Sequence, residues 1–216
     1  EVSARLEVVA LDPSKITKSV FSSVYCSVNM SGTLEPLESY IKITRLPEKT
    51  IRKAVPSPFP REHILPLVCC GVTTAMKHRT KSMYKKLVKR IAEAVRYTPE
   101  GNVGIFTASY EVSQGLLDAG IEDVTEKRFF LEHRGMPSKE NDLLVKQFKS
   151  YAEKDGAVLL GVEGGRASEG ADYPGKQMET VVVVGVPYAH PSPRINAQIQ
   201  YYEKQFPEHG REYGYV

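Results

Sequence analysis

Four short apolar runs, separated by stretches with helical periodicity, constrain the fold of this chain more than any other feature. They occupy residues 103–107, 128–131, 157–162 and 180–186 and are nearly continuous in aliphatic or aromatic side chains. A strand that faces solvent on one side alternates apolar and polar residues, so continuous runs indicate strands buried on both faces. The sequence therefore predicts a parallel sheet that is covered on both sides.

Amphipathic helices are predicted before, between and after these strands. The first covers about residues 80–96, where Met83, Leu87, Ile91 and Val95 recur every four residues and the opposite face is basic. Two further apolar stripes consist of Leu143, Leu144, Phe148, Tyr151 and Ala152, within 139–154, and of Ile195, Ile199, Tyr202 and Phe206. Strands separated by such helices predict right-handed βαβ crossovers, and hence an α/β fold with a doubly wound, mostly parallel sheet.

The first 55 or so residues follow a different pattern. Residues 5–11 and 24–29 are predicted to form strands, and Asp12-Pro13 is typical of a helix start. Five prolines between Pro47 and Pro66, mixed with basic residues, then indicate a linker or an extended excursion. This segment is the best candidate for a domain boundary.

The composition is that of an ordinary globular protein, with 41% hydrophobic and 25% charged residues, which excludes a disordered or collagen-like chain. No apolar run approaches the length of about 18 residues that a membrane span needs. Three cysteines, two of them adjacent, fit neither a disulfide framework nor a zinc site, and a reducing cytosol is the expected compartment. The chain begins without Met or an apolar leader, which favours a fragment.

Positive charge is concentrated in one part of the chain. Residues 42–96 hold 14 Lys and Arg residues against 3 Asp and Glu residues, although the net charge of the whole chain is only +3. Such asymmetry indicates a polyanionic partner, and a solvated basic helix face is an alternative of equal weight. We expect this segment to steer a nucleic acid rather than to hold it.

A glycine-rich segment directly after the third apolar run is the most informative stretch for function. It covers residues 161–174 and is expected to emerge at the carboxyl edge of the sheet, where open α/β folds bind ligands. Gly164 and Gly165 allow the backbone to approach a phosphate, while Arg166 offers a cation, Ser168 a hydroxyl and Asp172 an acceptor for a sugar hydroxyl. The pattern favours a nucleotide or nucleic-acid phosphate, with a purely structural turn as the alternative.

Four blocks of the sequence together resemble the successive motifs of XPD/Rad3-type helicases, in the same order. They are Met30-Ser31-Gly32-Thr33-Leu34-Glu35-Pro36, Gly104-Ile105-Phe106-Thr107-Ala108-Ser109-Tyr110, Arg166-Ala167-Ser168-Glu169-Gly170-Ala171-Asp172-Tyr173 and Gly185-Val186-Pro187-Tyr188, followed by Tyr201-Tyr202-Glu203. The resemblance covers nearly the whole chain and is strongest to the archaeal members of the family.

The resemblance implies a RecA-like (P-loop NTPase-type) sheet, incomplete at both ends, from a superfamily 2 DNA helicase in which two RecA-like domains close on ATP. Residues 1–55 would be the C-terminal portion of helicase domain 1, and residues 56–216 helicase domain 2, truncated before the arginine-finger motif. The expected function is that of a motor-domain fragment of an ATP-dependent 5′ to 3′ DNA helicase of nucleotide excision repair. Its expected partners are single-stranded DNA and the first motor domain, without a membrane, in the nucleoid-associated cytoplasm of an archaeal-type cell.

The chain departs from the family pattern in the ATPase machinery. It contains no Gly-x-x-x-x-Gly-Lys-Ser/Thr loop, no Asp-Glu-Ala-His box, no set of four cysteines for the family's iron–sulfur cluster and no arginine-finger block. ATP and Mg are therefore expected in the intact parent, bound mostly by motifs outside this sequence, and the iron–sulfur cluster is expected only in that parent. This chain alone is expected to lack ATPase activity. Ala171 also stands where the family usually has a larger aliphatic residue.

The resemblance further implies roles for individual residues, none of them catalytic or metal-binding. The coupling motif is Ser31, Gly32 and Thr33, the residues that face the nucleotide are Gly170 and Asp172, and the DNA-binding residues are Ser109, Tyr110, Arg134, Arg166 and Ser168. Alternatives stay open for three of these residues: Ser109 as a helix cap, Tyr110 as a packing residue and Arg134 as an ordinary surface arginine.

Two other functions are compatible with parts of the pattern. A non-catalytic RecA-like nucleotide-binding or interaction domain would keep the same sheet without a motor, and the presence of a phosphate loop upstream in the parent gene would distinguish the two. A Rossmann dehydrogenase is disfavoured, because no Gly-x-Gly-x-x-Gly opens a helix after the first strand.

Overall fold

The computed structural model describes residues 8–47, 49–188 and 192–214. The chain forms two compact units, one of residues 66–188 and one that joins residues 1–65 with residues 189–216. The domain boundary expected after residue 55 lies inside the second of these units. The predicted helicase domain 2, residues 56–216, therefore spans parts of both units.

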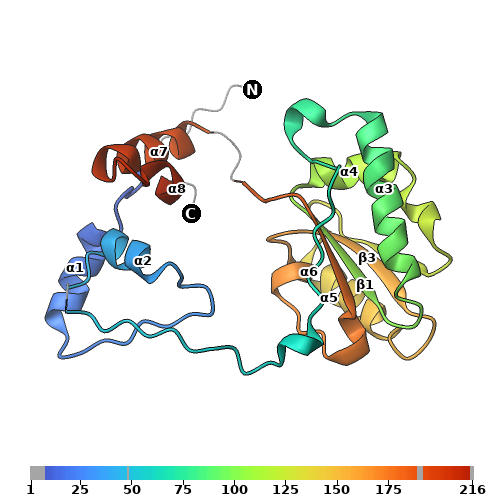
Figure 1. Cartoon of the computed structure of the whole chain (residues 1–216), viewed down its shortest axis with the longest axis horizontal. Coiled ribbons are helices and arrows are strands. Elements are labelled where there is room, and N and C mark those ends of the chain that lie inside the picture. The colour runs from blue at the N-terminus through green and yellow to red at the C-terminus, as the bar shows by residue number, and fades with distance from the viewer. Residues whose placement is uncertain (1–7, 48, 189–191, 215–216) are drawn as a thin grey trace. The chain divides into compact units, whose positions relative to one another are not determined.

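The unit of residues 66–188 is built on a parallel sheet of four strands, as predicted (Figure 1). These strands are β1 (Val103–Thr107), β2 (Arg128–Leu131), β3 (Ala157–Val162) and β4 (Thr180–Val184), in the order β2-β3-β1-β4. Every residue of β1 and β3 is buried, as their continuous apolar runs predict. The same prediction is wrong for the two edge strands, because Arg128 of β2 and Val181 and Val183 of β4 are exposed. The fourth strand is two residues shorter than the predicted 180–186 and ends before Gly185, whose φ of 98° turns the chain out of the sheet.

Helices cover both faces of this sheet, which confirms the doubly wound prediction. On one face, α3 (Lys81–Arg96), α4 (Tyr110–Asp118) and the 3-10 turn Ile121–Val124 share a core with Ile105 and Leu160. On the other face, α5 (Ser138–Lys149) and the single turn α6 (Arg166–Glu169) pack against Phe106 and Leu159. The alternation of side chains along each strand thus divides the apolar residues between two layers of core.

The boundaries of the two long helices depend on their caps. Helix α3 agrees with the predicted 80–96 because the Thr80 hydroxyl accepts a hydrogen bond from the Met83 amide at 3.2 Å and caps the first turn. Helix α5 ends at Lys149, whereas the apolar stripe predicted a helix as far as residue 154. Residues 151–155 form turns instead, and Gly156, with a φ of 69°, redirects the chain into β3.

The crossovers place a topological switch point between β1 and β3. The chain leaves β1 through α4 on one face and leaves β3 through α6 on the other, and these two strands are neighbours. Right-handed crossovers require this arrangement, because the two connections run in opposite directions across the sheet. Ligands of open α/β sheets bind at such a point, outside the carboxyl ends of the strands.

The second unit is helical in its described residues. It contains α1 (Ser14–Ser23), α2 (Leu37–Thr44), α7 (Pro193–Gln205) and α8 (Gly210–Gly214), and a short 3-10 turn at Arg61–His63. The Tyr201 hydroxyl donates to Asp12 Oδ2 at 2.6 Å, and the guanidinium of Arg45 lies 5.7 Å from the ring centre of Phe206. The Ser192 hydroxyl caps α7 and Pro193 occupies its first position, as is typical of helix starts.

Two strand predictions for this unit fail where the structure can test them. Residues 24–29 are irregular throughout, and Tyr25 and Val28 are exposed. Residues 8–11 are also irregular, while residues 5–7 lie outside the described part of the chain. An extended segment becomes a strand only when another strand pairs with it, and the described residues of this unit offer none.

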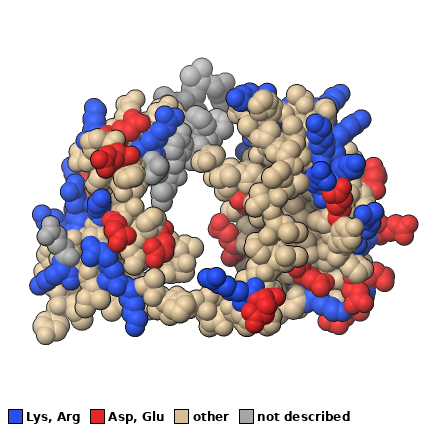
Figure 2. All heavy atoms as spheres, viewed as in Figure 1, with Lys and Arg blue, Asp and Glu red and all other residues tan. Residues whose placement is uncertain are grey.

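The exposed face of α3 is basic, in agreement with the sequence pattern. Six Lys and Arg side chains are exposed along this helix: Lys81, Lys85, Lys86, Lys89, Arg90 and Arg96. Figure 2 shows Lys and Arg side chains, in blue, gathered over the part of the surface where α3 lies. Within residues 8–47, 49–188 and 192–214, no helix is long and apolar enough to cross a membrane.

Candidate functional site

The loops that follow β1, β2 and β3 carry most of the residues predicted to bind DNA. Parallel strands end at one edge of the sheet, so these loops are neighbours, and the loops after β1 and β3 flank the switch point. Ser31, Gly32 and Thr33 belong to the other compact unit, where the Ser31 hydroxyl accepts from the Thr33 amide at 3.2 Å. All three residues of that motif are exposed.

The loop after β1 uses Ser109 to begin α4. The hydroxyl oxygen of Ser109 accepts from the Val112 amide at 3.3 Å, which confirms the helix-cap alternative for this residue. A capping hydroxyl uses its oxygen as the acceptor and keeps its own O–H available. Ser109 can therefore cap the helix and still donate to a ligand.

Tyr110 and Arg134 come together from two different loops. The Arg134 guanidinium carbon lies 5.7 Å from the centre of the Tyr110 ring, so the cation sits over an aromatic face. Partial burial raises the pKa of the Tyr110 hydroxyl, as does the charge of Glu132, while Arg134 acts in the opposite direction. This pair presents a cation and an aromatic ring at the edge of the sheet, two groups that favour single-stranded nucleic acid.

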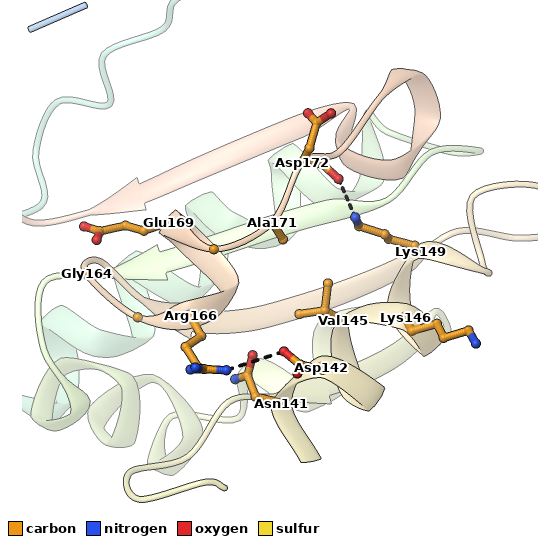
Figure 3. Close-up of a pocket in the computed structure, with 12 residues that line it drawn as sticks. Asn141, Asp142, Val145, Lys146, Lys149, Gly164, Arg166, Glu169, Ala171 and Asp172 are labelled. Atoms are coloured by element: carbon orange, nitrogen blue, oxygen red, sulfur yellow. Dashed lines mark hydrogen bonds and ion pairs between the residues drawn. The ribbon is translucent and has the colours of Figure 1, made fainter. Parts of the chain in front are cut away.

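The loop after β3 presents Arg166 at the start of α6. Gly164 has a φ of 74°, a value that favours glycine, and the Ser168 hydroxyl donates to the Gly165 carbonyl at 2.9 Å. The Arg166 side chain is 56% exposed, and its Nη1 lies 3.5 Å from Asp142 Oδ1 on α5. Figure 3 shows Arg166 turned toward Asp142 and Asn141.

An open hollow of about 650 Å³ lies between α5 and this loop (Figure 3). The charged residues that line it are mixed in sign: α5 contributes Asp142, Lys146 and Lys149, and the loop contributes Arg166, Glu169 and Asp172. The Lys149 ammonium donates to the backbone carbonyl of Asp172. The hollow is therefore built by ion pairs and backbone contacts rather than by one uniform charge.

Asp172 and Gly170 lie in the segment that follows α6. The Gly170 amide donates to the Arg166 carbonyl at 2.8 Å and ends the helical turn. The Asp172 carboxylate is exposed, points away from α5 in Figure 3, and has no hydrogen-bond or ion-pair partner in the described part of the chain. An exposed acceptor of this kind fits the hydroxyl donors of a nucleotide sugar.

Tyr173 fixes the end of the loop, because its hydroxyl donates to the Ala167 carbonyl at 2.7 Å. Burial and the charge of Glu132 raise the pKa of Tyr173 to about 12 from 10.0. The neutral phenol is thus favoured in the folded chain, and this stabilisation is complete below about pH 10 and is lost as the pH rises toward 12. We expect Tyr173→Phe to lower the free energy of unfolding by about 1 kcal/mol near pH 8.

The same comparison at high pH tests the sign of this effect. Near pH 11, where the unfolded phenol is ionised, the wild-type advantage over Tyr173→Phe should shrink. Urea unfolding of both proteins at the two pH values measures the difference. A wild-type advantage that stays constant would show that the hydroxyl is not held in its neutral form.

Glu132 is the site residue that sequence reasoning missed. It is 3% exposed and lies directly after β2. Its carboxylate accepts hydrogen bonds from the Asn141 side chain, the Val162 amide and the Arg166 amide, at 3.0, 3.4 and 3.1 Å. A glutamate between a strand and Arg134 gives no sign of burial in the sequence, since its donors come from segments further along the chain.

Within the described ranges, no three His, Cys, Asp or Glu side chains come together in a way that could hold a metal ion. Cys26, Cys69 and Cys70 are exposed, and each is a free thiol. Three cysteines, two of them adjacent, do not fit the four-thiolate set of an iron–sulfur cluster. The chain's own residues therefore provide no cluster site in the described part.

Comparison with known proteins matches residues 91–215 to the model of the helicase C-terminal domain. This chain belongs to the helicase C-terminal domain family. The matched residues include β1 to β4 and all the sheet-edge loops described above. The match confirms the resemblance to helicases that the motifs indicate.

Relatives and a solved structure agree with membership of this helicase family. The chain is 27% identical, over 85% of its length, to ATP-dependent DNA helicase CHL1 of Meyerozyma guilliermondii, and covers 24% of that protein. It is 23% identical, over 91% of its length, to the general transcription and DNA repair factor IIH helicase subunit XPD/RAD3 of Saccharomyces cerevisiae, and covers 27% of it. A solved XPD helicase structure superposes with a TM-score of 0.56 at 21% identity, over 80% of this chain and 30% of that one.

These comparisons confirm the XPD/Rad3-type resemblance and the RecA-like α/β fold. The chain spans about a quarter of the length of these curated relatives. Both relatives are fungal, so they give no support to the archaeal source expected from the sequence.

Proposed function

We propose that this chain is a motor-domain segment of an ATP-dependent DNA helicase that moves 5′ to 3′ along single-stranded DNA in nucleotide excision repair. The observation that carries the proposal is that the Tyr110–Arg134 pair and the exposed Arg166 both lie at the carboxyl edge of a helicase-family sheet. The two relatives, a DNA helicase and a DNA repair factor subunit, support the reaction and the pathway.

In this proposal the domain assignment follows the motifs. Residues 1–55 form the end of the first motor domain, with the coupling motif Ser31, Gly32 and Thr33, and residues 56–216 belong to the second. The rest of the first motor domain and single-stranded DNA are the partners. The archaeal-type, nucleoid-associated cytoplasmic location remains a prediction.

The proposed contacts with DNA differ in kind from residue to residue. Arg166 and Arg134 supply charge-assisted hydrogen bonds to phosphate, and Tyr110 supplies a ring on which a base or sugar can stack. Ser109 keeps its O–H free to donate to a phosphate oxygen, because its oxygen alone is used in the cap. The Ser168 O–H already donates to Gly165, so its proposed role at the DNA is to shape the loop.

The proposed nucleotide contacts are Gly170 and the free carboxylate of Asp172. ATP, when bound, supplies the phosphoryl group whose transfer drives movement, and Mg accompanies it. In this chain Asp172 would accept hydrogen bonds from the nucleotide sugar, and Gly170 would leave room beside it. The iron–sulfur cluster is proposed only for the intact parent.

We expect Asp172→Asn, in the longer parent protein, to reduce DNA-stimulated ATP hydrolysis while leaving the fold intact. The change removes a charged acceptor from an exposed loop position and no core contact. The expected loss is about 1.5 kcal/mol or more in kcat/KM for ATP, or about tenfold. Glu169→Gln, a similar loss of charge in the same loop, is the matched control. Unchanged ATPase kinetics in Asp172→Asn would make Asp172 structural.

The same assay tests the proposed function as a whole. Hydrolysis of ATP by the parent protein, measured with and without a single-stranded oligonucleotide, should rise when the oligonucleotide is added. A parent that binds nucleotide without DNA-stimulated hydrolysis would instead support the non-catalytic RecA-like domain.

A further inference from the structure

A buried carboxylate lies beneath the switch point, where all of its hydrogen-bond partners are donors. Oε1 of Glu132 accepts from Asn141 Nδ2 at 3.0 Å and from the Arg166 amide at 3.1 Å. Oε2 accepts from the Val162 amide at 3.4 Å. These donors belong to α5, to the start of α6 and to the end of β3, so one side chain connects three elements that build the edge of the sheet.

The carboxylate takes the place of missing backbone partners at two of these positions. The Glu132 amide donates to the Leu160 carbonyl at 2.9 Å, and the next ladder bond, from the Val162 amide, is accepted by the side chain. The Arg166 amide is at the first position of α6, where an N–H group has no acceptor within the helix. Without Glu132, the buried Val162 amide and the partly buried Arg166 amide would each lose this acceptor.

The surrounding glycines are adapted to this carboxylate. A Cβ at Gly161 would lie 2.9 Å from Glu132 Oε2, and one at Gly165 would lie 2.7 Å from the same atom. Both distances are shorter than any normal carbon contact, so the glycine-rich loop needs its glycines here in order to close over Glu132. Burial raises the pKa of Tyr110 and of Tyr173, and the charge of Glu132 raises both further.

We propose that Glu132 is a positioning residue that sets the place of Arg166 at the sheet edge through the Arg166 backbone amide. This inference rests on the proposed binding of DNA phosphate by Arg166 and adds to it the group that holds the loop. Glutamine has the same shape as glutamate but replaces one acceptor oxygen with an NH₂ donor. In Glu132→Gln, this NH₂ group would therefore lie against at least one of the N–H donors that the carboxylate now accepts from. Glu132→Gln therefore tests the acceptor requirement with no change in volume.

Two measurements on the 216-residue chain separate positioning from binding. Hydrogen exchange followed by NMR should show the Arg166 amide exchanging about tenfold faster or more in Glu132→Gln, with the amide of Ile91 in α3 unchanged. Glu140→Gln is the matched control, because Glu140 is an exposed glutamate on α5 whose carboxylate lies 3.7 Å from His133 Nε2 and contacts none of the donors around Glu132. Should Glu132→Gln fail to fold, Asn141→Ala removes one of the three donors and should move the Arg166 amide in the same direction by a smaller factor.

A double-mutant cycle, in which the oligonucleotide affinity of each variant is measured, then tests whether Glu132 acts through Arg166. Glu132→Gln should weaken binding of a short single-stranded oligonucleotide about tenfold in the wild-type background and very little in the Arg166→Ala background. An equal loss in both backgrounds, or an Arg166 amide that exchanges at the wild-type rate in Glu132→Gln, would overturn the positioning role. If the wild-type chain does not bind the oligonucleotide, the proposed function fails and hydrogen exchange alone decides the role of Glu132.

Discussion

Phe148→Ala should lower the free energy of unfolding by about 3–5 kcal/mol. The ring is completely buried in the layer of core between α5 and the sheet. It makes edge-to-face contacts with Phe130 and Tyr173, with ring centres 5.9 and 6.1 Å apart. Truncation leaves a cavity beneath the hollow that Arg166 borders, because α5 supplies both the buried ring and the residues that face that loop.

Urea unfolding of the 216-residue chain, followed by far-ultraviolet circular dichroism, measures this change. Leu143→Ala is the matched control on the same helix, since its side chain is 54% exposed and should cost less than about 1 kcal/mol. A loss below about 1 kcal/mol for Phe148→Ala would mean that α5 does not close the core in the way described.

Arg166→Ala should weaken the affinity for single-stranded DNA by about 1–3 kcal/mol, which is about 5- to 150-fold. In the free chain the guanidinium pairs with Asp142 at 3.5 Å, and a DNA phosphate would replace that carboxylate. Arg96→Ala, which removes the same charge at the end of α3, should change the affinity much less. Asp142→Asn frees Arg166 from a solvent-exposed ion pair and should tighten binding slightly, because such pairs contribute about 0–1 kcal/mol. Fluorescence anisotropy of a labelled oligonucleotide compares the four proteins.

An affinity for Arg166→Ala equal to that of Arg96→Ala would contradict a specific contact. The two substitutions remove the same charge and differ in position. Of these two arginines, only Arg166, in the loop after β3, is proposed to contact the DNA.

The sheet could be predicted from the sequence because each strand is a short, nearly continuous apolar run, although only the two central strands, β1 and β3, are buried along their whole length. A short continuous apolar run such as Ala157–Val162 indicates a buried strand in an α/β chain. The amphipathic helices predicted between these runs then indicate that the strands are joined by helical crossovers. The predicted strand at residues 24–29 failed because its apolar residues carry no information about a partner strand. The predicted helix 139–154 was too long because two apolar residues lie in a turn: Tyr151 packs against the core that α5 contributes to, and Ala152 is buried.

The site could be predicted only where a motif marks it. Gly164, Gly165 and Arg166 stand out in the sequence, and their place after a buried strand predicts the sheet edge. Glu132 does not stand out, because its burial depends on donors from α5, β3 and α6 that come later in the chain. The pairing of Tyr110 with Arg134 was hidden for the same reason, since two separate loops bring them together.

In the proposed function, DNA crosses the carboxyl edge of the sheet and is only steered by the basic face of α3. The most direct test measures oligonucleotide affinity by fluorescence anisotropy at a low and at a physiological salt concentration, for Arg166→Ala and for the triple change Lys85→Ala, Lys86→Ala and Lys89→Ala. The triple change should flatten the salt dependence, because each phosphate neutralised on a single strand contributes a slope of about −0.7, while Arg166→Ala should cost more affinity at physiological salt. A greater loss from the triple change at physiological salt would contradict the account and make the basic face of α3 the binding surface.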